Sequence, residues 1–353
     1  MSNTRARVPL VWILRGPKAG DYAQLQLLAR AMDVQAVTKQ LAFRSWELLL
    51  HAFPIPTLAA LDRSKSDTLE APWPDLVLTA GRRNELVARW IRAASGNRAR
   101  IVHVGRPWSN PRQFDLVVSN RQYLLDELDD VVVNDLPLTD LTESTLAPER
   151  AVWGAKWREL PHPWTVVLVG GDSGPLVFSP KWARELAERV NARKAEYGGS
   201  VLVSTSGRTP RRSADVLLHT LKGPQFVYRW PSSEPNPFRG LLACGDEFVV
   251  TGDSMSMLAE ASATGKPVFL FDFSDAGPGL SALRWKPLVH RLAMSVGPVR
   301  MRRDLGRIHA ALLAAGRVRL LQRTPDATVV VPSKVTSNDL QRTVQRVRAL
   351  LER

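Results

Sequence analysis

The chain has 353 residues, of which 44% are hydrophobic and 23% charged. These proportions exclude a disordered chain, and the length suits two domains of ordinary size. Forty-eight Lys and Arg residues oppose 34 Asp and Glu residues, giving a formal net charge of +14. The charge fits nucleic acid, anionic lipid headgroups or phosphorylated substrates, or else a compositional bias toward arginine. No zinc-ligand set, helix-turn-helix or RNA-recognition motif accompanies it, so nucleic acid ranks below a membrane surface or a sugar nucleotide.

Cysteine content and apolar runs indicate the compartment. Cys244 is the single cysteine, so an internal disulfide is impossible. The apolar run at residues 8–14 is short and is followed by charge instead of a cleavage site. No run reaches the roughly 18–20 apolar residues of a membrane span. We therefore expect a cytoplasmic protein, either free or peripheral at the inner face of a membrane.

The first 145 residues carry a regular succession of short apolar strands and charged turns. The strands lack polar alternation, which is typical of parallel strands covered on both faces. Residues 1–145 are therefore predicted to form one Rossmann-like domain. Its strands are expected at residues 8–14, 34–41, 75–79, 101–104, 114–119 and 131–134, and its helices at 22–32, 43–53 and 85–94. The very apolar helix at 43–53 is either a membrane-facing patch or an ordinary core helix.

Polar side chains follow several of these strands. Asp21 comes after the first strand and is either a catalytic base or a plain helix N-cap. Arg82 and Arg83 follow the third strand and Arg106 follows the fourth, where they would hold an anionic acceptor or phosphate. His103, at the end of the fourth strand, is either a base or a structural residue.

A second β/α series begins after a proline-punctuated boundary at residues 138–163. Residues 146–335 are predicted to form a second Rossmann-like domain. Residues 336–353 carry a basic amphipathic helix, whose apolar stripe predicts that it docks on a core. Strands are expected at residues 165–169, 200–204, 225–230, 248–251 and 267–271, and helices at 149–158, 179–193, 236–243, 255–264, 288–293, 303–314 and 338–351.

Glycine, hydroxyl and arginine residues occupy two turns of the second series. Gly170 and Gly171 would let a diphosphate or a base approach the backbone closely. Ser206, Arg208 and Thr209 follow the next strand. That turn is either a clamp for a departing diphosphate or a solvated loop.

The stretch from Asp246 to Phe273 indicates a strand, a polar turn, a helix and a second strand. The backbone N–H groups of Ser254 and Met255 would lie at the helix N-terminus, where anions bind. Glu260, further along the helix, is either a ribose ligand or a buried structural glutamate. Asp253 has no second carboxylate at the spacing of a DxD metal site, so no metal is expected.

This stretch resembles the donor-nucleotide segment of GT-B glycosyltransferases: strand, Thr-x-x-Ser/Gly, Glu-Ala, Gly-x-Pro, strand. With the further motifs it is similar to the plant mitochondrial-fission factor family (the "elongated mitochondria" proteins) and its bacterial relatives. The resemblance implies an α/β GT-B-like fold, in which two Rossmann-like β/α/β domains face a central cleft and the C-terminal helix crosses back onto the first domain. The further motifs are Gly81-Arg82-Arg83, residues 114–118, Gly170-Gly171, residues 205–210 and Asn236-Pro237-Phe238.

The resemblance leaves three functions open. The first, an enzyme, is a metal-independent glycosyltransferase without a cofactor, which takes a nucleotide-diphosphate sugar as substrate and a lipid-linked or cell-envelope acceptor. Asp21 would be its base. The second is a non-catalytic GT-B scaffold or adaptor, favoured because residues 119–122 (Ser-Asn-Arg-Gln) replace the acidic or histidine pair of relatives. The third is a GT-B-fold nucleotide-sugar epimerase. The nucleotide base, sugar, acceptor and oligomeric state stay open.

Overall fold

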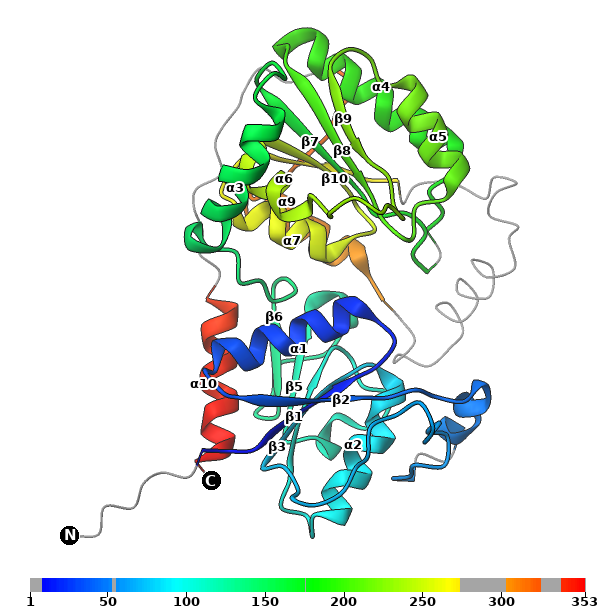
Figure 1. Ribbon diagram of the computed structural model, residues 1–353, viewed down its shortest axis with the longest axis vertical. Coiled ribbons are helices and arrows are strands. Elements are labelled where there is room, and N and C mark those ends of the chain that lie inside the picture. Colours follow the sequence, from blue (N-terminus) through cyan, green and yellow to red (C-terminus); the bar gives the residue numbers. More distant parts are fainter. Residues whose placement is uncertain (1–7, 53–54, 175, 274–302, 325–337, 353) are drawn as a thin grey trace, which may run out of the picture. The chain divides into compact units, whose positions relative to one another are not determined.

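The computed structural model describes residues 8–52, 55–174, 176–273, 303–324 and 338–352 (Figure 1). The helix predicted at residues 288–293 lies outside these ranges. The chain divides into two compact units, one formed by residues 1–139 with 337–353 and the other by residues 140–336. In the described ranges, no helix combines the length and apolar character needed to cross a membrane.

The first unit is built on a six-stranded parallel sheet with the order β2-β1-β3-β4-β5-β6. Helices α1 and α10 pack on one face of the sheet and α2 packs on the other, so the central strands are buried on both sides. The elements are β1 (Val11–Arg15), α1 (Ala19–Ala31), β2 (Ala36–Gln40), η1 (Ser45–Ala52), β3 (Leu76–Ala80), α2 (Arg82–Ala94), β4 (Arg100–Val104), η2 (Pro111–Gln113), β5 (Leu116–Asn120), η3 (Arg121–Tyr123), β6 (Val131–Asn134) and α10 (Asp339–Leu351).

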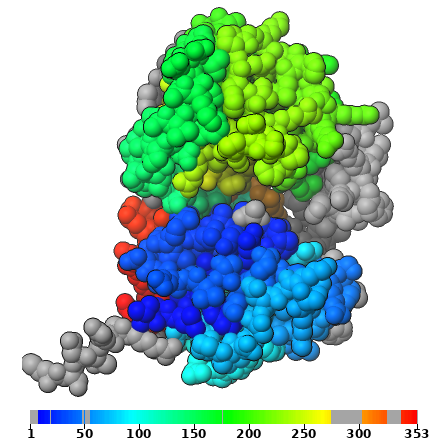
Figure 2. All heavy atoms as spheres, in the orientation of Figure 1, coloured from blue at the N-terminus to red at the C-terminus, as the bar shows by residue number. Residues whose placement is uncertain are grey.

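Helix α10 closes the first unit although it is the last element of the chain. Its Val344 and Val347 join the core beneath α1, and the space-filling view shows the two helices side by side (Figure 2). The basic face is engaged as well: Arg342 donates to the Val133 carbonyl at 2.7 Å and Arg348 to the Met32 carbonyl at 3.1 Å. These arginines anchor the helix within its own unit.

The second unit repeats the plan with the strand order β12-β11-β10-β7-β8-β9, again all parallel. Its turns after β7, β8 and β10 lie at one edge, because neighbouring parallel strands end on the same side of a sheet. The elements are α3 (Glu143–Trp157), β7 (Trp164–Val169), α4 (Pro180–Tyr197), β8 (Ser200–Thr205), α5 (Arg211–Thr220), β9 (Gln225–Tyr228), α6 (Phe238–Cys244), β10 (Glu247–Thr251), α7 (Met255–Ala263), β11 (Val268–Phe271), α9 (Leu305–Ala314) and β12 (Arg319–Leu320).

Two helix predictions need correction, and some elements were not predicted. The helix predicted at 149–158 begins at Glu143, because Thr142 and Thr145 form a capping box upstream of Pro148, which lies inside the helix. The helix predicted at 43–53 is a 3₁₀ helix at Ser45–Ala52. Helix α5 and the short strand β12 were not predicted.

Candidate functional site

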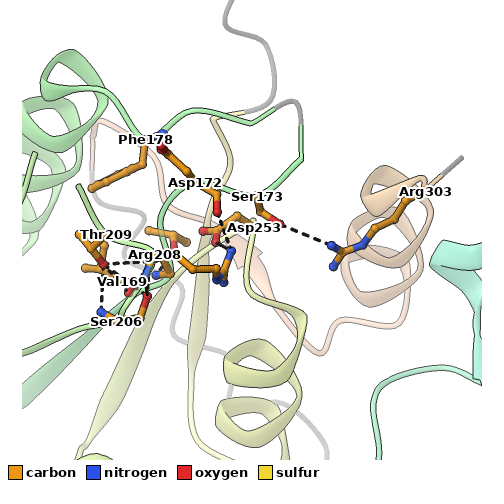
Figure 3. Close-up of polar contacts among 12 residues, drawn as sticks. Val169, Asp172, Ser173, Phe178, Ser206, Arg208, Thr209, Asp253 and Arg303 are labelled. Atoms are coloured by element: carbon orange, nitrogen blue, oxygen red, sulfur yellow. Dashed lines mark hydrogen bonds and ion pairs between the residues drawn. The ribbon is translucent and has the colours of Figure 1, made fainter. Parts of the chain in front are cut away.

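Two hydroxyl side chains tie the turns after β7 and β8 together (Figure 3). The hydroxyls of Ser206 and Thr209 both donate to the Gly170 carbonyl, Thr209 at 2.8 Å. The Gly170 amide donates in turn to Thr251 Oγ1 at 2.8 Å. These polar groups of the predicted clamp are therefore satisfied by one another, and they fix the backbone around Arg208.

Arg208 lies between two turns and bonds to both. Its Nη1 is 2.7 Å from Asp253 Oδ2 and donates to the Asp172 carbonyl at 3.2 Å. The Asp253 side chain is fully buried, whereas the Arg208 side chain is 41% exposed. Within the described ranges, Nε and Nη2 of Arg208 have no protein partner, so both can donate to a bound anion.

The environment of Asp253 is unusual for a carboxylate. Burial raises its pKa, although the neighbouring Arg208 guanidinium favours the charged form. Removal from water therefore outweighs the stabilising partner. The turn after β10 therefore contributes a buried acid, Asp253, to the site. The sequence motif had given Asp253 no role there.

Gly170 and Gly171 make room for protein atoms. A Cβ atom on Gly170 would lie 2.2 Å from Asp253 Oδ2, and one on Gly171 would lie 2.2 Å from the Arg208 carbonyl oxygen. Gly171 also has a φ of +130°, which side-chain-bearing residues rarely adopt. The glycine pair is thus explained by the close approach of Asp253 and Arg208, while its approach to a ligand stays a prediction.

The amino end of α7 lies directly after Asp253. Ser254 is the N-cap residue, yet its side chain makes no capping hydrogen bond. Ser254 and Met255 are buried, and the first-turn N–H groups of a helix have no intrahelical acceptor. The site therefore combines the positive end of a helix with the outward donors of Arg208.

Glu260 lies further along α7 and belongs to a different charge group. Its nearest charges are Arg239, which donates to Asp140 Oδ1 at 3.0 Å, and Asp140 itself. Burial raises the pKa of Glu260 to about 7. No protein hydrogen bond to its carboxylate is found in the described part of the chain, so the structure does not join Glu260 to the Arg208 network.

Trp230 is an exposed aromatic residue beside the Arg208 turn. Its backbone amide donates to Thr205 Oγ1 at 2.9 Å, and its indole lies over Gly207, with Nε1 3.1 Å from the position of a Cβ atom there. The side chain is 48% exposed. An indole fixed on one side and open to solvent on the other can stack a flat ring.

In the first unit, Asp21 lies in the first turn of α1, whose N-cap residue is Lys18. The N-cap interpretation of Asp21 is therefore wrong. Its Oδ2 is 3.1 Å from the position of a Cβ atom on Gly81, so it lies against the turn between β3 and α2. His103 is completely buried, 3.7 Å from Glu85, and burial lowers its pKa. This environment favours the structural interpretation of His103.

The three arginines predicted on the acceptor side each have protein partners. Arg83 Nε is 2.7 Å and Arg82 Nη2 is 3.7 Å from Oε1 of the buried Glu47. Arg82 also lies over the Trp108 ring, at 5.0 Å from its centroid. Arg106 donates to two carbonyls of the loop after β5. Their role toward an acceptor stays a prediction.

Comparison with known sequences identifies the family. The model of the family described as Mitochondrial fission ELM1 matches residues 19–343. The chain belongs to the mitochondrial fission ELM1 family. Mitochondrial fission protein ELM1 of Arabidopsis thaliana is 29% identical over 241 residues, 62% of this chain and 55% of the plant protein, so the match spans little more than half of that relative. An uncharacterized protein of Rickettsia prowazekii is 21% identical over 322 residues, 80% of this chain and 87% of the relative.

A solved structure agrees on the fold. The UDP-glucosyltransferase from Polygonum tinctorium that glucosylates indoxyl has a TM-score of 0.50 at 12% identity, with 99% of this chain and 100% of that chain covered. Together with the two six-stranded parallel sheets, this likeness confirms the predicted GT-B-like α/β fold. In the described ranges of this ELM1-family chain, no group of three or more His, Cys, Asp or Glu side chains is placed to hold a metal ion.

Sequence reasoning missed Asp253 and Trp230 as members of the candidate site. Asp253 was considered only as a metal ligand, whereas its partner is Arg208. The pattern that points to it is a Gly-Gly turn at the end of one strand and an aspartate at the end of another strand, three strands further along the sequence. For Trp230 the signal is an aromatic residue directly before Pro231 at the end of a strand.

Proposed function

We propose that this ELM1-family protein is a glycosyltransferase that binds the diphosphate of a nucleotide sugar at the carboxyl edge of its second sheet. The observation that carries the proposal is the state of Arg208. Asp253 and the Asp172 carbonyl hold Nη1, while Nε and Nη2 remain available. Two parallel N–H donors match the oxygen pair of a phosphate, and the amino end of α7 adds to the attraction.

The nucleoside part of the donor would lie along the neighbouring turns. Trp230 offers a stacking surface for the base, and Glu260 is the proposed acceptor of hydrogen bonds from the ribose hydroxyls. Gly170, Gly171 and Ser254 would line the path of the diphosphate. Ser206 and Thr209 would act indirectly, because their hydroxyls hold the backbone that positions Arg208.

The chemistry requires a base and a stabilised leaving group. A base takes the proton of the acceptor hydroxyl, the oxygen attacks the anomeric carbon, and the nucleoside diphosphate departs with the bonding electrons. Arg208 and the α7 N–H groups would carry the charge of the departing diphosphate. Asp21, on the first unit, is the proposed base.

The proposed acceptor is lipid-linked or part of the cell envelope, bound through the first unit at the inner face of a membrane. Supporting features are the net charge of +14 and two exposed apolar side chains near η1, Trp46 and Ile55. Arg82 and Arg83, at the start of α2, and Arg106, in the loop that follows β4, would then act on the acceptor.

A non-catalytic scaffold is the second candidate function. The plant relative is named as a mitochondrial fission protein. Asp253 also neutralises much of the charge that Arg208 would offer to a diphosphate. A protein that keeps the GT-B fold for recruiting another protein would tolerate such neutralisation, whereas an enzyme must overcome it with other donors.

A thermal-shift screen separates these functions. The full chain is tested with UDP, GDP, CDP, ADP, TDP and their common sugars, beside Arg208→Ala and the control Arg212→Ala, an exposed arginine of α5. At a hundredfold excess over its dissociation constant a ligand stabilises by about 2.7 kcal/mol. We expect one diphosphate to stabilise the wild type and the control but not Arg208→Ala. Absence of any shift in melting temperature would favour the scaffold. If the protein instead epimerises the donor sugar in the absence of an acceptor, it is an epimerase.

A further inference from the structure

We propose that α9 and the residue before its cap complete the donor site, with Arg303 as a second cation for the diphosphate and His309 as a positioning residue for the turn before α7. The inference rests on the proposed function and extends it to a third stretch of the chain. Neither residue belongs to the turns after β7, β8 and β10 from which the site was built.

His309 is bonded to the turn that carries Asp253. The residue is 5% exposed, and its Nε2 lies 2.8 Å from the Gly252 carbonyl oxygen. Because a carbonyl only accepts, Nε2 is the donor of this bond. The contact is close: a Cβ atom on Gly252 would lie 2.9 Å from His309 Cε1. Asp272 Oδ2, at the end of β11, flanks the other ring nitrogen at 3.9 Å.

This bond fixes the peptide plane on which the ion pair depends. The Gly252 carbonyl and the Asp253 amide belong to one planar trans peptide, so orienting one orients the other. The Asp253 carboxylate then holds Arg208 at 2.7 Å. His309 thus acts on the diphosphate through the turn and the ion pair, without touching the ligand.

Arg303 reaches the site from the amino end of α9. It lies just before Asp304, the N-cap of that helix, and its Nη1 donates to Ser173 Oγ at 3.4 Å (Figure 3). Ser173 follows Asp172, whose carbonyl accepts from Arg208. The two guanidinium groups therefore bond to consecutive residues of one loop. Two guanidinium groups on one loop suit a ligand with two linked phosphates.

Calorimetric titration of the full chain tests the inference. UDP, GDP, CDP, ADP and TDP are titrated, and each is compared with its parent nucleoside. We expect Arg303→Ala to weaken the diphosphate that binds by about tenfold or more, the effect of losing one charge-assisted hydrogen bond, and to leave the nucleoside unchanged. Arg307→Ala is the matched control, because Arg307 lies on the same helix and its side chain pairs with Asp304 among the residues that the structure describes.

The histidine is tested by two variants. His309→Leu removes the donor to Gly252, and His309→Gln keeps an N–H at a similar reach. We expect the leucine variant to lose diphosphate affinity about tenfold and the glutamine variant to recover part of it. If the leucine variant does not fold, the glutamine variant and the titration of Arg303→Ala still test the proposal about α9.

The outcomes are distinguishable. If the wild type binds a diphosphate through Arg208 while Arg303→Ala matches Arg307→Ala, the inference about α9 is overturned and the proposed function stands. Loss of nucleoside and diphosphate affinity to the same degree in Arg303→Ala would also overturn it, because a phosphate contact acts on one ligand alone. If the wild type binds none of the five diphosphates, the proposed function fails and the inference fails with it.

Discussion

The carboxylate of Asp253 and the guanidinium of Arg208 lie 2.7 Å apart but differ in their access to water. The carboxylate is buried, whereas the Arg208 side chain is 41% exposed. If the arginine is removed, a buried carboxylate is left without its ion-pair partner. If the acid is removed, the remaining guanidinium can turn to solvent. The pair is therefore asymmetric in its effect on stability.

We predict that Arg208→Ala lowers the free energy of unfolding by roughly 2–3 kcal/mol and Asp253→Asn by about 1 kcal/mol, below the range for fully buried pairs because Arg208 is partly hydrated. Burial raises the pKa of Asp253, so its contribution to stability falls as pH rises. The deficit of Arg208→Ala should therefore be larger at pH 8 than at pH 5. Urea denaturation at both pH values measures it, and equal deficits for the two variants would contradict the asymmetry.

Glu260 should make the stability of the second unit depend on pH. Its pKa is raised from 4.5 to about 7, so the folded protein keeps a proton that the unfolded chain has released. Stability is therefore lost as pH rises through this window, by at most on the order of 3 kcal/mol. We expect Glu260→Gln to remove this loss. Melting curves at pH 5 and pH 8 test it, with Glu188→Gln, an exposed residue of α4, as the control.

The glycine pair should tolerate no side chain. Gly170→Ala places a Cβ atom against Asp253, and Gly171→Ala places one against the Arg208 carbonyl, each at 2.2 Å. We expect each to cost 2 kcal/mol or more in unfolding free energy. Gly174→Ala, at φ +59° with open space around it, should cost only about 1 kcal/mol of backbone strain. Similar costs at all three positions would rule out the packing explanation.

Trp230 should affect nucleotides but not pyrophosphate. If the indole stacks a base, Trp230→Ala weakens the bound nucleoside diphosphate by about 1–3 kcal/mol, a typical value for base–aromatic stacking. Pyrophosphate has no base, so its affinity should not change. Titration of both ligands checks this, beside Trp46→Ala, which removes an exposed tryptophan of the first unit.

Asp21 should matter for transfer and not for donor binding. We expect Asp21→Asn to lower kcat by about 10²- to 10⁴-fold, the usual contribution of a positioned base. Donor affinity should stay unchanged, because Asp21 belongs to the first unit. Asp33→Asn, at the other end of α1, is the control. A variant with full activity would show that another group takes the proton.

The strands were predictable because burial on both faces leaves a continuous apolar run. β6 was predicted at 131–134 and found at Val131–Asn134, and β10 was predicted at 248–251 and found at Glu247–Thr251. Helix boundaries were less predictable where a polar cap competes with a proline. Thr142 caps α3 upstream of Pro148, a residue that by itself indicates a break.

The sequence by itself determined the two β/α series, their parallel character and the turns that end on glycine, hydroxyl and arginine residues. A sequence pattern depends only on residues that are neighbours along the chain, and each of these features is set by such neighbours. Only the tertiary structure decided the partners. Arg208 meets Asp253 because β10, β7 and β8 are adjacent in the sheet, and Arg303 reaches Ser173 across 130 residues of chain. Strand order and turn geometry set such contacts, and neither is written in the periodicity of any one segment.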